Sequence, residues 1–182
     1  MLYLLDANVL ITAHNQYYPL DAVPEFWEWL LHMADSKSVK MPLETFEEVT
    51  VGHEDGLVEW MKADRLGERL MLDEEVDPVM VRRVLEEGYA PDLSDTEVEQ
   101  VGRDPFLIAY ARADARHRCV VSVEASKPSK QRANRRVPDV CASLGVPCCD
   151  SFAMMRRLGF TTAWKANGKV GAPLSVVRAQ AS

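Results

Sequence analysis

The sequence predicts an α/β fold of three layers, α/β/α, in which helices cover both faces of a central, mostly parallel twisted sheet. Short apolar runs bounded by polar residues, typical of buried strands, occur before Asp6 and near residues 39–41, 69–72, 119–123 and 146–149. Between most of these runs lie longer stretches with apolar side chains at helical spacing. Strands that alternate with helices through short loops favour parallel pairing, so the carboxyl ends of the strands should share one edge.

The helices are predicted from spacing, prolines and caps. Pro42 and Pro105 suit the first position of a helix, which places Asp104 at an N-cap. Ser94 and Glu97 have the spacing of a capping box. The predicted helices cover residues 9–15, 23–34, 42–51, 56–61, 76–87, 104–113, 138–144 and 150–158, with one more after Ser94.

One helix raises a question about partners. In residues 23–34 the apolar stripe includes Trp27, whereas Trp29 and Met33 lie off it. Additional core contacts account for these two side chains most simply, and the alternative is an exposed apolar surface for self-association or another partner.

Length and composition limit the function. The 182 residues suit a single domain over 1–164 with a loosely ordered tail over 165–182. A net charge of -7 argues against a protein that coats nucleic acid through Lys and Arg alone. The four cysteines form no C-x-x-C pair, and we expect reduced thiols, a cytoplasmic location, no signal peptide and no membrane span.

Acidic residues follow the predicted strands. Asp6 ends the first strand, Glu124 follows the run 119–123, and Asp104 opens a helix that leads back to the same edge. Carboxylates gathered in a small volume repel one another unless they bind protons or a cation. Hard oxygen ligands without matching His or Cys favour Mg²⁺ or Mn²⁺, and such a site suits metal-assisted hydrolysis of phosphodiesters.

Four separated blocks, in this order, resemble the PIN domain family of VapC-type toxin ribonucleases over about residues 2–160. They are Leu-Leu-Asp-Ala-Asn-Val-Leu-Ile at 4–11, Phe-Glu-Glu-Val at 46–49, Asp-Pro-Phe-Leu-Ile-Ala-Tyr-Ala at 104–111 and Val-Val-Ser-Val-Glu at 120–124. The resemblance implies a PIN-like fold and a homodimeric Mg²⁺- or Mn²⁺-dependent endoribonuclease. It also implies the toxin role of a type II toxin–antitoxin pair, with RNA as substrate and an antitoxin as partner.

The resemblance also assigns roles. It makes Asp6, Glu48, Asp104 and Glu124 the catalytic and metal-binding acids and Asn8 the residue that orients Asp6. Glu124 stands where the family usually has an aspartate, and its additional methylene shifts the carboxylate by more than about 1 Å. Asp150, at the start of the last helix, is a candidate peripheral fifth acid.

Each acid also has a purely structural interpretation. Asp104 is accounted for as an N-cap before proline, and Glu44, Glu47 and Glu48 as a solvated helix face whose acids favour the helix dipole. Asp6 is the hardest to account for in this way, because an apolar strand gives it little solvent.

A basic loop follows Glu124 and would place positive charge where an RNA backbone enters. A solvated connection is the simpler interpretation of this loop. Its basic residues, with Arg112 and Arg116 of the preceding helix as an extension, are Lys127, Lys130, Arg132, Arg135 and Arg136. The histidines, His14, His32, His53 and His117, show no ligand spacing.

Two other functions compete. A haloacid-dehalogenase-like phosphatase also opens with an apolar strand that ends in a nucleophilic aspartate, but it normally has a second aspartate where this chain has Asn8. The other is a catalytically weak PIN-like scaffold that binds RNA or protein, which Glu124 and the acidic composition favour.

Overall fold

The computed structural model describes residues 1–51 and 55–166. Four parallel strands form one sheet in the order β2-β1-β3-β4. The strands are β1 (Leu2–Leu5), β2 (Val39–Lys40), β3 (Arg118–Val121) and β4 (Cys148–Cys149). β1 pairs with β3 along its whole length, from Leu2 opposite Arg118 to Leu5 opposite Val121. The predicted parallel sheet is therefore confirmed.

Helices and helical turns connect and follow the strands. In the first half of the chain they are α1 (Ala7–Thr12), the π-helical turn η1 (Ala13–Tyr17), α2 (Pro24–Asp35), α3 (Leu43–Thr50), α4 (Gly56–Lys62), η2 (Ala63–Arg65) and α5 (Leu66–Leu70). In the second half they are α6 (Pro78–Arg83), the π-helical turn η3 (Val84–Tyr89), α7 (Asp95–Val101), α8 (Asp104–Ala113), η4 (Arg132–Asn134), α9 (Val137–Ser143) and α10 (Ser151–Arg157).

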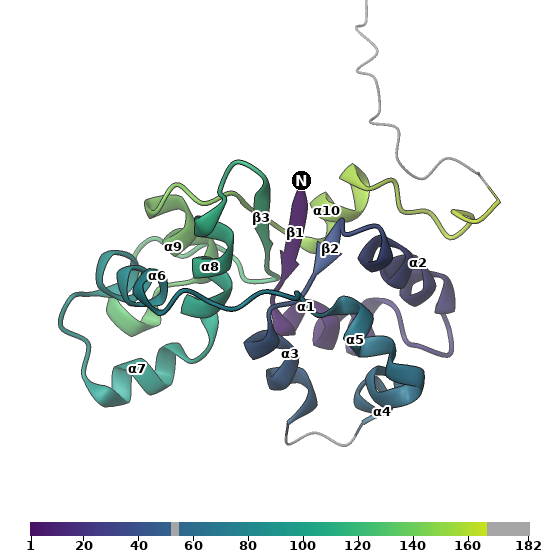
Figure 1. Cartoon of the computed structure of the whole chain (residues 1–182), viewed down its shortest axis with the longest axis horizontal. Helices are drawn as coiled ribbons and strands as arrows, with labels where there is room; N and C mark the ends of the chain where they lie inside the picture. Colours follow the sequence, from purple (N-terminus) through teal and green to yellow (C-terminus); the bar gives the residue numbers. More distant parts are fainter. Residues whose placement is uncertain (52–54, 167–182) are drawn as a thin grey trace, which may run out of the picture.

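The two faces of the sheet carry separate apolar cores. Tyr3 and Leu5 of β1 belong to one core, which α1, α2, α4, α5 and α10 complete, whereas Leu4 points to the other, which α6, α7, α8 and α9 complete. This alternation is the two-residue period of a strand buried on both faces. It gives the three predicted layers, with one helical layer on either side of the sheet (Figure 1).

The strands deliver their carboxyl ends to one edge of the sheet. In Figure 1 β1 runs downward from the N-terminus, and α1 and α3 begin beyond the ends of β1 and β2. α10 likewise follows β4 after a single residue, and a long loop over residues 122–131 follows β3. In parallel α/β sheets this edge is where ligands bind.

Two local predictions are wrong. Arg69–Leu72 is not a strand, because Arg69 and Leu70 end α5 and only Met71 pairs with Met41 in a single parallel bridge. Asp104 is not an N-cap, because it is the first residue of α8, and Arg103, at the cap position, makes no side-chain capping bond. The N-cap role, which was the simplest structural interpretation of Asp104, is therefore excluded.

The apolar side chains of α2 pack into the core. Trp29 is 0% exposed and Met33 3% exposed, so both are core residues, as their simpler interpretation predicted. Trp27 is also buried, at 2% exposed. The alternative interpretation of Trp29 and Met33, an exposed apolar surface for self-association or another partner, is therefore wrong.

Several remaining expectations concern the chain as a whole. All four cysteines are free thiols. In the ranges that the structure describes, no helix has both the length and the apolar character that crossing a membrane requires. His53 and the predicted tail beyond residue 166 lie outside the described residues.

Candidate active site

Asp6 is the most buried acid of the site. Its side chain is 3% exposed between the end of β1 and the start of α1. The hydroxyl of Ser122 donates to Asp6 Oδ2 at 2.9 Å, and the backbone N–H of Asn8 donates to Oδ1 at 3.4 Å. The Asn8 side chain itself is exposed, so the contact that orients Asp6 from this position comes from the backbone.

Ser122 connects two of the predicted acids. It follows β3, which lies beside β1, and its hydroxyl accepts a hydrogen bond from the backbone N–H of Glu124 at 3.2 Å while it donates to Asp6. The side chain is 3% exposed. Sequence reasoning missed this role, and the only available indication was a small polar residue next to the carboxyl end of an apolar strand.

Thr45 fixes the helix that carries Glu48. Its buried hydroxyl lies 3.2 Å from the backbone oxygen of Leu5 and 3.0 Å from that of Pro42. One bond joins the first turn of α3 to the end of β1, and Glu48 stands one turn later on the same helix. Glu48 itself is exposed, whereas Thr45 is buried.

Arg103 joins the same helix to the start of α8. Its Nη1 donates to the backbone oxygen of Glu44 at 3.1 Å and to Glu47 Oε2 at 2.7 Å. Glu47 is thus an ion-pair partner rather than a free surface acid. Arg103 precedes Asp104, so this contact sets the position of Asp104 relative to α3.

The four acids affect one another electrostatically. Burial, together with the charges of Asp6, Glu124 and Glu48, raises the pKa of Asp104 to about 8 against the opposing effect of Arg136. Burial also raises the pKa of Asp6 to about 6, with the Ser122 bond opposing and Glu48 and Glu124 adding to the shift. Partial burial raises the pKa of Glu48. The chain therefore brings these four carboxylates into one electrostatic group.

Asp104 is the least compensated member of this group. Among the described residues its carboxylate takes part in no hydrogen bond or ion pair, although it is half-buried. A half-buried carboxylate without a protein partner loses part of its hydration, which a proton or a cation at the site would compensate. This is the observation that most directly calls for a ligand at the site.

Glu124 is arranged differently. Arg136 donates to its Oε1 at 2.6 Å, and the backbone N–H of Val137, the first residue of α9, donates to its Oε2 at 2.8 Å. Both oxygens are therefore occupied, and the longer side chain is used to hold the start of α9. An aspartate at this position would be one methylene too short for the same pair of bonds.

A pocket of about 260 Å³ opens beside Asp104 and Glu124. Lys130, Arg135 and Arg136 also line it, so the pocket combines acidic and basic side chains. Arg135 also donates to the backbone oxygens of Gly88 and Asp139, and these bonds hold its guanidinium in place.

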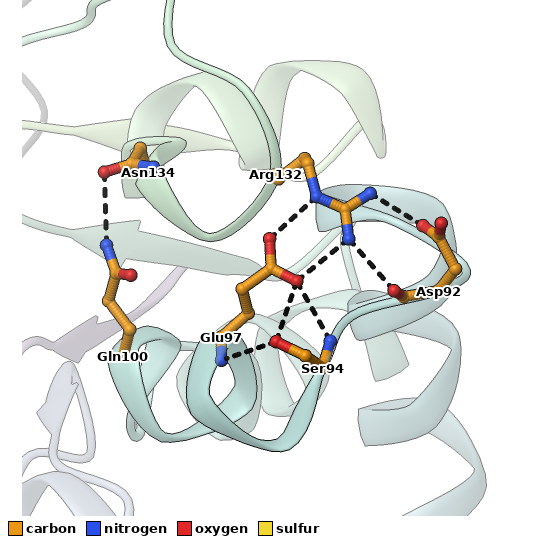
Figure 2. A network of polar contacts seen from close by, with 6 residues as sticks. All are labelled: Asp92, Ser94, Glu97, Gln100, Arg132 and Asn134. Carbon is orange, nitrogen blue, oxygen red and sulfur yellow. Dashed lines mark hydrogen bonds and ion pairs between the residues drawn. The ribbon is translucent and has the colours of Figure 1, made fainter.

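The other predicted basic residues have different positions. Arg132 is part of a structural network, in which it bonds Glu97 and Asp92 and so fastens the loop to α7 (Figure 2). Arg112 pairs with Glu87 in the last turn of α8, at the end opposite Asp104, and does not extend the pocket. Lys127 is exposed on the loop.

Asp150 serves as a helix cap. Its exposed side chain accepts from the backbone N–H of Ala153 at 2.6 Å at the start of α10. In the described part of the chain no contact connects it to the acid group, so the interpretation as a peripheral fifth acid gains no support.

Tyr89 is a buried neighbour that the sequence did not indicate. It ends the π-helical turn η3, and its hydroxyl has no hydrogen-bond partner among the described residues. Burial raises its pKa, and the nearby charge of Asp104 adds to the shift. π-Helical turns often accompany functional sites, but a tyrosine in an apolar segment carries no such indication in the sequence.

The donors suit a hard divalent cation, and their present arrangement does not enclose one. Carboxylate oxygens are the ligands that Mg²⁺ and Mn²⁺ prefer, and a cation would relieve the repulsion that raises the pKa values of Asp6 and Asp104. Within residues 1–51 and 55–166, however, no three His, Cys, Asp or Glu side chains stand close enough to hold a metal ion. One reason is that Glu124 is bonded to Arg136 and Val137.

Comparison with known proteins places the chain in a family. Residues 3–162 match the family described as "Domain of unknown function (DUF4411)". The chain belongs to the DUF4411 family. The match spans both apolar cores and all four acids of the site, and the description names no activity. No curated protein and no solved structure shows a significant match to the chain.

Proposed function

We propose that this DUF4411 chain is an endoribonuclease that uses Mg²⁺ or Mn²⁺ to hydrolyse RNA phosphodiester bonds. The observation that carries the proposal is the half-buried carboxylate of Asp104, which has no partner in the described part of the chain, near the buried Asp6 at the carboxyl edge of a parallel sheet. The PIN-like order of the four sequence blocks favours a nuclease over other metal-dependent hydrolases.

The acids of the site would bind the ion, and the basic residues would bind the RNA. Asp6 and Asp104 would hold the ion with Glu48, and Glu124 would join them only after leaving Arg136 and Val137. The bound ion would supply an activated water and neutralise charge on the scissile phosphate. Ser122 keeps Asp6 in one orientation, and Lys130 and Arg136, which line the same pocket as Asp104, would attract the phosphate backbone.

The principal experiment removes one charge at a time from the acid group. Asp6→Asn and Asp104→Asn should each lower Mn²⁺-dependent cleavage of single-stranded RNA by at least about 100-fold, because each removes a ligand that the reaction needs. Asp150→Asn is the matched control, since asparagine caps a helix as well as aspartate and Asp150 lies outside the acid group. Full cleavage by a folded Asp6→Asn chain would contradict the proposal.

The alternatives predict different results. A phosphatase that used Asp6 as a nucleophile would form a phosphoaspartate, which can be trapped and found by mass spectrometry. A binding scaffold would retain RNA without cutting it, and the engagement of Glu124 by Arg136 is the observation that favours this alternative. Calorimetric titration with Mn²⁺, followed by cleavage assays on several RNA types, separates binding from turnover.

The biological setting is part of the proposal. A toxin role with a cognate antitoxin and a homodimeric state follow from the PIN resemblance, and the free thiols are in keeping with the reducing cytoplasm. A small gene for a DNA-binding protein directly upstream would support the toxin role. Light scattering after gel filtration tests the dimer.

A further inference from the structure

Two exposed aromatic side chains contact each other on the surface. Tyr17 is 47% exposed and Phe152 39% exposed, and their ring centroids lie 5.2 Å apart at an interplanar angle of 73°. Large aromatic rings are usually buried for most of their area, so an exposed pair in contact suggests a surface that binds something. The proposed chemistry of the acid group uses neither ring.

The pair lies beside the candidate active site. Phe152 is the second residue of α10, which begins just after β4 at the carboxyl edge of the sheet. Tyr17 and Ser151 line a small apolar hollow together with Val123, which stands between Ser122 and Glu124. β4 is two strands away from β1, a spacing of about 10 Å, so the start of α10 and the end of β1 lie at the same edge of the sheet.

The exposed residues next to the two rings in the sequence are polar. Asn15 and Gln16 precede Tyr17 and are exposed, and Asp150 and Arg156 flank Phe152 on α10 and are also exposed. Apart from the small apolar hollow, the exposed apolar surface here consists of these two rings, whereas a stable protein interface buries roughly 800 Å² on each partner. One planar ligand the size of a nucleobase fits such a patch.

We propose that Tyr17 and Phe152 form a platform on which an unpaired base of the RNA substrate stacks next to the scissile phosphate. The proposal rests on the proposed ribonuclease function and specifies its substrate as single-stranded RNA or a loop, because bases in a duplex have no free face. The aromatic pair would then hold a base, while the pocket that Lys130 and Arg136 line together with Asp104 and Glu124 would receive the phosphate backbone.

The test separates base contacts from phosphodiester chemistry. Alanine at Tyr17 or Phe152 should weaken binding of a fluorescein-labelled single-stranded RNA about 5- to 100-fold in EDTA, the usual range for loss of one stacked base. Tyr17→Phe and Phe152→Tyr keep the rings and should bind as the wild type does. Val79→Ala removes an exposed apolar side chain from α6 and is the matched control.

Three further measurements make the result decisive. The same RNA with abasic positions should bind all variants equally, and Mn²⁺-dependent cleavage of that abasic RNA, which has no base to stack, should be as fast in the alanine variants as in the wild type. RNA that carries 2-aminopurine should lose fluorescence on binding the wild-type chain, a readout that needs no variant.

The outcomes that overturn the platform differ from those that overturn the nuclease. Unchanged RNA affinity in both alanine variants, or an equal loss for abasic RNA, contradicts stacking while cleavage by the wild type still supports the nuclease. A change of oligomeric state in the alanine variants would make the pair a contact between copies instead. A wild-type chain that cleaves neither substrate contradicts the proposed function whatever its affinity for RNA.

Discussion

At the scale of single residues, the positions of the acids depend on neutral and basic neighbours. Ser122 orients Asp6, and Thr45 positions the helix that carries Glu48. Arg103 positions Asp104. Each acts through a contact between segments far apart in the chain, so neither spacing nor propensity indicated it. Asp6 was predictable because a carboxylate at the end of an apolar strand is costly to bury unless donors or a ligand compensate its charge.

Glu124 gives the sharpest prediction at this scale. Replacement by alanine removes the bond from Arg136 and leaves the N–H of Val137 without its partner. Hydrogen bonds to charged groups contribute about 1.5–3 kcal/mol, so Glu124→Ala should lower the free energy of unfolding by about that amount and the Tm by several degrees. Thermal unfolding followed by circular dichroism measures the change.

The controls for Glu124 use residues of similar type. Glu99→Ala removes an exposed glutamate from α7 and should leave the Tm within about one degree. Glu124→Asp should also lower the Tm, because the shorter side chain does not reach both donors. A Glu124→Asp chain as stable as the wild type would show that the anchor at the start of α9 is unimportant.

At the scale of elements, helices with a regular local pattern were predicted from the sequence, and irregular segments were not. The long amphipathic pattern of α2 and the capping box of α7 were placed correctly, because each is a local pattern. The segment 69–72 was misassigned, because the helix α5 extends into an apolar run that resembles a strand. The π-helical continuation η3 depends on tertiary packing and has no pattern of its own.

The loop before α9 is held by a network that allows a test of local order. Arg132 bonds Glu97 and Asp92, the pKa of Glu97 is lowered to about 2 chiefly by the Arg132 contact, and Gln100 donates to Asn134 nearby (Figure 2). Exposed ion pairs contribute little to global stability, but several together order a loop.

Arg132→Ala should therefore increase backbone amide exchange in residues 92–101 and 130–136 and leave the Tm nearly unchanged. Hydrogen exchange measured by mass spectrometry resolves these segments. Arg116→Ala, which removes another exposed arginine, should leave the same amides protected. Unaltered exchange in Arg132→Ala would mean that backbone packing alone orders the loop.

At the scale of the whole molecule, the three-layer architecture followed from simple alternation. Parallel strands bring their carboxyl ends to one edge whatever their exact boundaries. The prediction that Asp6, Asp104 and Glu124 lie near one another at that edge therefore did not depend on the exact limits of the predicted elements. The orientation of each carboxylate did not follow, since it depends on partners such as Arg136 that only the folded chain brings near.

The acid group also makes a prediction about the stability of the whole chain at different pH values. The pKa of Asp104 is about 8 in the folded chain against an ordinary value of 3.8, and that of Asp6 is about 6. Between pH 4 and 8 the folded state therefore holds more protons than the unfolded state, and its stability falls as pH rises, by at most about 1.4 kcal/mol per pH unit for each proton.

In EDTA the Tm should decrease from pH 5 to 8. Asp104→Asn should flatten that decrease above pH 6, and Asp150→Asn should not. Mn²⁺ should restore the Tm at pH 8 in the wild type, because a cation replaces the lost proton. A Tm in EDTA that is constant or rises over this range would show that the four carboxylates are not coupled as described.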